Sequence, residues 1–120
     1  MALKATSFND ALDYKIINET AATNSLNSNV TIAPGKLYSV KAVNGSSSAS
    51  FVKIFDDPNP TLGATLPVLV VAITGSATSM LEIPGGLDFT TLSIAATRYQ
   101  SPTDTTAPNG GTVALTLVCS

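Results

Sequence analysis

The sequence predicts an all-β protein: a single-domain, antiparallel β-sandwich with jelly-roll-like connections and a less regular N-terminal arm. Apolar and polar residues alternate with a period of two along much of the chain, the pattern of a strand with one buried and one exposed face. Clusters of Gly, Pro and Asn separate these runs as turns do. No segment keeps the i, i+3, i+4 apolar spacing for the length of an amphipathic helix.

The central part of the chain begins with a two-faced strand over residues 37–43, and a second strand-like run covers residues 50–55. Asn44-Gly45 follows the first run directly. Because both central positions of a type I′ turn need positive φ, Asn-Gly between two such runs indicates a hairpin. We therefore expect these two strands to pair.

A second hairpin is expected further along the chain. Residues 56–67 contain three prolines, whose missing N–H donors exclude an interior strand, so this segment is an exposed connection. The apolar run at 68–74 and the alternating run at 79–83 are strands, and Gly75-Ser76 between them marks a turn.

The C-terminal part contains the last two predicted strands. Pro84-Gly85-Gly86 marks a turn, and residues 87–99 are rich in β-branched residues, with a length that indicates a bulge or bend. Residues 100–111 form a polar loop. Residues 113–119 alternate cleanly and close the fold as a two-faced strand.

The phases of these strands predict the apolar core. Its expected members are Val40, Val52, Ile54, Leu69, Val71, Ile73, Leu81, Ile83, Leu92, Ile94, Leu115 and Leu117.

The first third of the chain is less regular. Residues 14–17 and 29–32 are strand-like, and a polar tract at 18–28 separates them. We therefore divide the chain into an N-terminal arm and edge segment, residues 1–33, and a β-sandwich domain, residues 34–120.

The composition of the chain excludes some classes of function. Of the 120 residues, 44% are hydrophobic and only 12% are charged, against about 25% charged in typical domains, so the surface must be built largely from neutral polar residues. The six Lys and Arg residues are scattered and the net charge is −2, so nucleic acid is not an expected partner. The start of the chain lacks the apolar stretch of a secretory signal, and the longest apolar run is too short to cross a bilayer. We expect a chain made in the cytoplasm with no membrane partner.

Catalytic residue types are scarce. The chain has no His, and its single cysteine, Cys119, is embedded in a strand, which removes His-based triads, thiol proteases and the common zinc sites. A carboxylate pair could in principle hydrolyse a glycosidic bond, and Asp56-Asp57 with Asn59 could bind Ca²⁺. No spaced ligand series supports the calcium site, and loop aspartates usually cap strand ends. We expect no enzymatic activity, no metal and no cofactor.

Several strand starts and turns after Pro34 resemble those of small structural proteins of tailed bacteriophages, the capsid decoration or cement proteins. The resemblance covers about two thirds of the chain. The segments that carry it are Pro34-Gly35-Lys36-Leu37-Tyr38, Phe51-Val52-Lys53-Ile54-Phe55-Asp56, Pro60-Thr61-Leu62-Gly63, Leu66-Pro67-Val68-Leu69, Ile83-Pro84-Gly85-Gly86-Leu87-Asp88-Phe89 and Thr103-Asp104-Thr105-Thr106.

The resemblance implies a virion structural protein that binds the outer surface of an assembled capsid and stabilises it. The partner would be the major capsid protein, and the protein itself would form a homotrimer at threefold or quasi-threefold positions. Such a protein needs contact area and shape rather than reactive groups.

The N-terminal segment is the expected site of contact with the capsid or a neighbouring copy. Its apolar residues stand among polar spacers that are too irregular for a self-contained unit, so they need a partner to bury against. These residues are Leu3, Phe8, Leu12, Tyr14, Ile16 and Ile17. Two alternatives stay open: a carbohydrate- or receptor-binding β-sandwich of a phage fibre, which requires aromatic platforms, and a tail or baseplate component.

Overall fold

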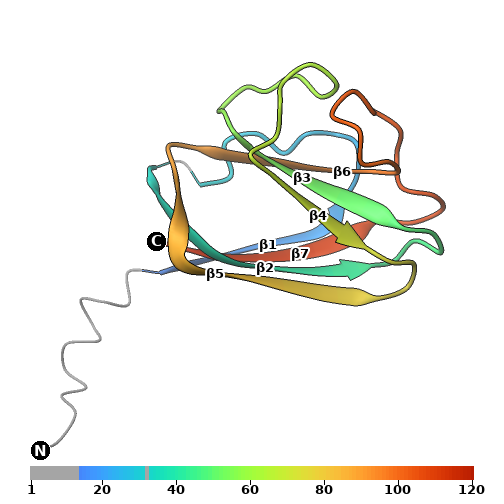
Figure 1. Ribbon diagram of the computed structural model, residues 1–120, viewed down its shortest axis with the longest axis horizontal. Coiled ribbons are helices and arrows are strands. Elements are labelled where there is room, and N and C mark those ends of the chain that lie inside the picture. The colour runs from blue at the N-terminus through green and yellow to red at the C-terminus, as the bar shows by residue number, and fades with distance from the viewer. Residues whose placement is uncertain (1–13, 32) are drawn as a thin grey trace, which may run out of the picture.

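Two antiparallel sheets packed face to face make up the computed structural model, which describes residues 14–31 and 33–120 (Figure 1). The predicted all-β antiparallel sandwich is confirmed. The strands are β1 (Lys15–Ala22), β2 (Gly35–Asn44), β3 (Ser50–Asp56), β4 (Leu69–Ile73), β5 (Thr78–Phe89), β6 (Leu92–Thr97) and β7 (Val113–Cys119).

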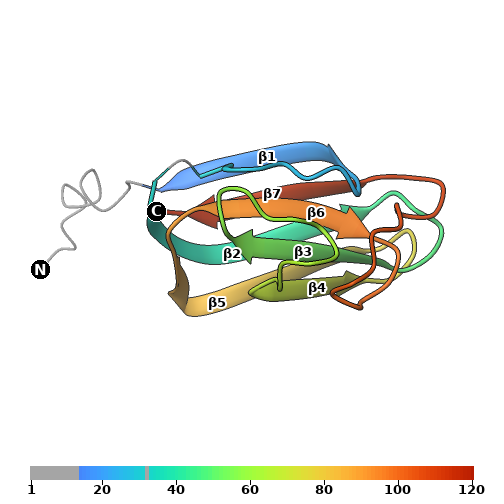
Figure 2. The same cartoon turned by 90° about the horizontal axis from the view of Figure 1, so that it is seen from above.

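The larger sheet has the strand order β1-β7-β2-β5, and the smaller one has the order β4-β3-β6. Figure 2 shows the smaller sheet lying over the larger one. Among the described strands, only β3 and β4 are neighbours both in the chain and in a sheet, and the connections β2–β3, β4–β5, β5–β6 and β6–β7 pass from one sheet to the other. Most strand pairing is therefore non-local in the chain.

The inner faces of both sheets supply the core. Every residue predicted for the core packs in it: most are buried, while Leu69, Leu81 and Ile83 are partly buried against the same cluster. The period-2 pattern predicted these positions because a strand in a sandwich can turn only alternate side chains inward.

The predicted N-terminal segment, residues 1–33, contributes a strand to the sandwich. β1 pairs with β7 from Lys15↔Cys119 to Ala22↔Val113, and Ala22 is buried in the core. Further along, an isolated bridge joins Asn27 to Ile94 of β6. Residues 15–31 thus belong to the sandwich itself, because their backbone completes the outer edges of both sheets.

The predicted hairpin at Asn44-Gly45 is wrong: β2 and β3 lie in different sheets, and neither residue has positive φ. Alternation along two strands cannot distinguish pairing within a sheet from stacking between sheets, since both turn one face inward. Asn44 instead acts as a buried polar bracket. Its Nδ2 donates to the carbonyls of Ser48, Ile73 and Thr74 at 2.9–3.2 Å, and its Oδ1 accepts from the Ser46 amide and the Ser50 hydroxyl.

The second predicted hairpin is also wrong, because β4 and β5 belong to different sheets. Nor does the chain reverse at Pro84-Gly85-Gly86, which forms a bulge inside β5, with φ of 81° at Gly85 and 80° at Gly86. β5 is an edge strand, where a bulge and a proline discourage pairing with other chains. A Cβ on Gly86 would lie only 2.8 Å from Lys36 Cβ, so the close approach of β5 to β2 requires glycine.

Truncation of a core side chain to Ala should destabilise the protein. Ile54→Ala removes a fully buried side chain and should lower the free energy of unfolding by about 2–5 kcal/mol, measured by denaturant titration. Leu66→Ala serves as the control, because Leu66 is 73% exposed and its truncation should change stability by less than about 0.5 kcal/mol. Equal losses for the two variants would refute the assignment of Ile54 to the core.

Candidate functional site

The outer side of the sheet β1-β7-β2-β5 is the candidate functional site, and we call it the open face. Register places Ile16, Val118, Ser39 and Glu82 in one row across the four strands, and Asn18, Thr116, Lys41 and Met80 in the next. Opposed residues in a sheet project to the same side. Four large apolar side chains are exposed here: Tyr14 at 47%, Ile16 at 67%, Val43 at 41% and Met80 at 58%.

The outer side of the smaller sheet is covered over β3 and β6 by two loops, residues 57–68 and 98–112, which Figure 1 shows above these strands. Beneath these loops, Lys53 and Phe55 project away from the core of the sandwich and are nevertheless almost fully buried. The Ser93 hydroxyl of β6 donates to the Asp57 carbonyl at 2.6 Å and holds the first loop down. Within residues 14–31 and 33–120, one sheet face is therefore covered by loops and the other is not.

Lys53 anchors the second loop. Its Nζ donates to the carbonyls of Ser101 at 2.6 Å and Asp104 at 3.1 Å. Burial lowers the pKa of Lys53 below its ordinary value, while the charge of Asp104 opposes that shift. Partial burial raises the pKa of Asp104, but bonds from the Thr106 hydroxyl and the Tyr99 and Thr106 amides, with the Lys53 charge, hold it below its ordinary value overall.

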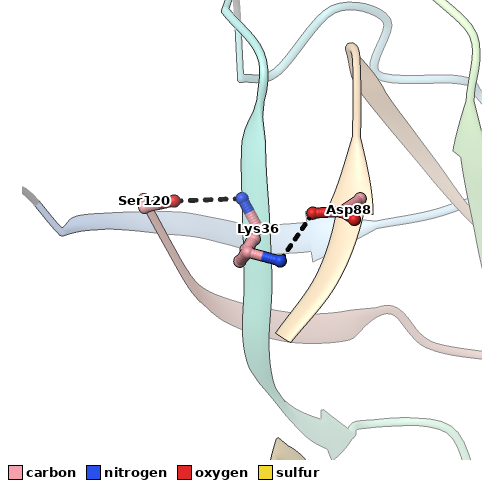
Figure 3. Close-up of polar contacts among 3 residues, drawn as sticks. All are labelled: Lys36, Asp88 and Ser120. Carbon is pink, nitrogen blue, oxygen red and sulfur yellow. Dashed lines mark hydrogen bonds and ion pairs between the residues drawn. The ribbon is translucent and has the colours of Figure 1, made fainter. Parts of the chain in front are cut away.

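One end of the open face is fixed by the C-terminal residue, as Figure 3 shows. The Lys36 amide donates to Ser120 Oγ at 3.0 Å, and the Ser120 amide returns a bond to the Lys36 carbonyl at 2.9 Å. Lys36 Nζ pairs with Asp88 Oδ1 at 2.7 Å, and this hydrogen bond and the Asp88 charge raise the pKa of Lys36. Both side chains are exposed to solvent, so the pair orders this corner and adds little stability.

Beside this corner lies a shallow, open depression of about 360 Å³, formed where the β5 bulge leaves β2. Tyr38 contributes the aromatic ring of its lining, and the Tyr14 ring stands edge-on to Tyr38 with centroids 5.4 Å apart. Its lining is Tyr38, Ser39, Glu82, Ile83, Pro84 and Gly85. A ring, a hydroxyl and a carboxylate at an open hollow suit the reception of a protruding side chain or sugar.

The acidic residues and the cysteine of the described part of the chain form no metal-binding cluster. No group of three or more His, Cys, Asp or Glu residues in residues 14–31 and 33–120 could hold a metal ion. Asp56 accepts from the Thr90 and Thr91 amides and Asp57 from the Asn59 amide, so both cap turns. Cys119 is buried, and burial raises the pKa of its thiol. Within these residues, no helix has the length and apolar character needed to traverse a bilayer.

The predicted contact residues divide into three groups. Tyr14 and Ile16 lie exposed on the open face, whereas Ile17 turns inward and packs against the core. Leu3, Phe8 and Leu12 lie outside the described residues, so their contact stays a prediction. The sequence analysis did not predict Val43 and Met80 as surface contact residues. Both alternate with the inward-facing residues of their strands, β2 and β5, and this alternation indicates that they face outward.

No protein-family model, curated protein or solved structure matches the chain.

The anchoring role of Lys53 can be tested with Lys53→Met, which keeps an apolar stem and removes the charged donor. Loss of two charge-assisted hydrogen bonds, worth about 1.5–3 kcal/mol each, should speed amide hydrogen exchange at Tyr99 and Thr106 by about tenfold or more. Lys41→Met is the matched control, because Lys41 projects from the open face and should leave this loop unchanged. Unaltered exchange in Lys53→Met would contradict the anchoring role.

Proposed function

We propose that the protein is a virion structural protein, a decoration or cement protein that binds the outer surface of an assembled phage capsid through its open face. The observation that carries this proposal is that four of the seven large apolar side chains exposed in the described part of the chain lie together on one regular sheet face, whereas Leu66, Val68 and Tyr99 belong to the loops on the other side. Tyr14, Ile16, Val43 and Met80 gather on one sheet face while loops cover the other. An apolar sheet face in a soluble molecule is a typical docking surface.

The chemistry of the open face suits a protein partner. Small neutral residues such as Asn18 and Thr116, whose side chains bond to each other at 3.0 Å, lie between the apolar side chains and keep the surface flat. Lys41 lies in the same row and would attract a carboxylate on the shell. Mixed apolar and neutral polar area with few charges is characteristic of interface cores.

Because a capsid presents many copies of the same surface, a weak contact at each copy is sufficient for stable attachment. Burial of apolar area contributes about 25 cal/mol per Å², and much of this is offset by the entropy lost on docking. A homotrimer that engages several copies of the major capsid protein gains from effective concentration, so each open face need bind only weakly. The trimer and the partner come from the resemblance and are part of the proposal.

A second candidate function, a carbohydrate- or receptor-binding module, is favoured by the depression at the end of the open face. Tyr38 offers a ring and Glu82 a carboxylate, the groups that commonly contact sugar rings and hydroxyls. Among the described residues, this depression has no second ring parallel to Tyr38, because Tyr14 stands at 87° to it. The capsid proposal uses the whole face and ranks first for that reason, ahead of a tail or baseplate component.

Placing a positive charge on the open face tests the capsid proposal. Ile16→Lys and Met80→Lys should each reduce co-sedimentation with undecorated capsids of the source phage by about tenfold or more, because each buries a charge at the contact. Both side chains are more than half exposed, so the folded protein should tolerate the changes.

Leu66→Lys is the matched control, since Leu66 is equally apolar, 73% exposed, and lies in the loop over the other sheet. It should bind as the unaltered protein does. Equal loss in all three variants would contradict the open face as the contact. Failure of the unaltered protein to bind capsids, together with binding to a glycan array, would replace the capsid proposal with the sugar-binding one.

A further inference from the structure

The chain contains two Asn-Gly dipeptides in opposite environments, both at the end of the sandwich where β2 ends and β7 begins. Asn44-Gly45 ends β2, and Asn109-Gly110 precedes β7. Asn-Gly is chemically the most labile asparagine context, because glycine has no Cβ to obstruct attack by its own amide nitrogen on the preceding side chain. The fold decides whether that attack can occur.

At Asn44-Gly45, hydrogen bonds hold both reacting groups, the Asn44 side chain and the Gly45 amide, in place. Its side chain is 2% exposed, and each of its polar atoms is hydrogen-bonded: Nδ2 to carbonyls of Ser48, Ile73 and Thr74, Oδ1 to donors. The nucleophile is occupied as well, since the Gly45 amide donates to the Thr112 carbonyl at 2.8 Å. Bringing the Gly45 nitrogen onto the Asn44 side-chain carbon would require breaking these bonds together.

Asn109-Gly110 has much less of this protection. Asn109 and Gly110 are both exposed, and within residues 14–31 and 33–120 the Gly110 amide makes no hydrogen bond. The Asn109 side chain makes one bond there, from Nδ2 to the Ser48 hydroxyl at 3.2 Å at the surface. Gly110 has φ of 76° with open space where a Cβ would stand, so its backbone is accessible.

We propose that Asn109 is a site of spontaneous deamidation, and that Asn44, with the same following residue, is protected by the fold. The Gly110 nitrogen forms a bond to Asn109 Cγ, the Cγ–Nδ2 bond breaks, and the Gly110 N–H proton leaves with Nδ2 as ammonia. Water then adds to either carbonyl of the resulting succinimide ring. Opening at one carbonyl gives aspartate, and opening at the other gives isoaspartate, in which the main chain runs through the former side chain.

The modification would act on a close-packed junction. The Ser46 hydroxyl donates to the Asn109 carbonyl at 2.6 Å, and a Cβ on Gly111 would lie 2.5 Å from the Gly45 carbonyl oxygen. Either product adds a negative charge, and isoaspartate also adds a backbone atom. The extra atom must displace residues 109–112 from the loop that joins β2 to β3, where Asn44 forms its bracket. Ageing of the protein should therefore loosen this end first.

The experiment incubates the full chain at mildly alkaline pH and follows both Asn-Gly peptides by mass spectrometry, with chromatographic separation of aspartate from isoaspartate. Deamidation at Asn109 should exceed that at Asn44 by about a hundredfold or more, because reaction at a buried, hydrogen-bonded site requires local opening. Asn109→Gln should abolish the signal assigned to this site, since glutamine would need a larger ring.

A parallel incubation in concentrated urea separates the effect of the fold from that of the sequence. Both Asn-Gly sites should then react at similar rates. Equal reaction at the two sites in the folded protein would overturn the proposal. So would an Asn109 that stays intact in the folded protein while it reacts in urea, because its environment would then be protective.

Discussion

Packing of two sheets face to face is the constraint on which the rest of the structure depends. Each strand can turn only one of its two sides toward the shared core. The outer side of each sheet must therefore be solvated, covered by another segment of the chain, or bound by a partner. The chain resolves this differently for its two sheets. Loops 57–68 and 98–112 cover β3 and β6, while no described segment covers the apolar side chains of β1, β2 and β5.

The cover over the smaller sheet depends on an unusual buried cation. Lys53 occupies an outward position of β3, where a charged residue would ordinarily be solvated, and the loop brings backbone carbonyls to its amine instead. Phe55, two residues on, becomes part of a second apolar layer outside the core. This arrangement leaves the open face as the one large sheet surface available for binding among the described strands.

Strand positions and core residues could be predicted from the sequence, because alternation is a local property that each strand carries in full. Partners could not: the pattern of Val40 and Val52 is the same whether their strands pair or stack, and the Asn44 signal that favoured a hairpin serves a buried bracket instead. The burial of Lys53 could not be predicted either, because it is produced by a loop about 50 residues further along the chain. Two residues of the open face, Tyr14 and Ile16, were predicted as contact residues. Met80 could be assigned to the same surface only from the strand order, which places β5 beside β2.

The orientation of the protein on its partner tests the central claim most directly. In an electron-microscopy map of the decorated phage particle, the account predicts that β1, β7, β2 and β5 face the shell, with Ile16 and Met80 at the contact. The loops at 57–68 and 98–112 should then point to solvent. A map in which those loops touch the shell and the open face is bare would contradict the account.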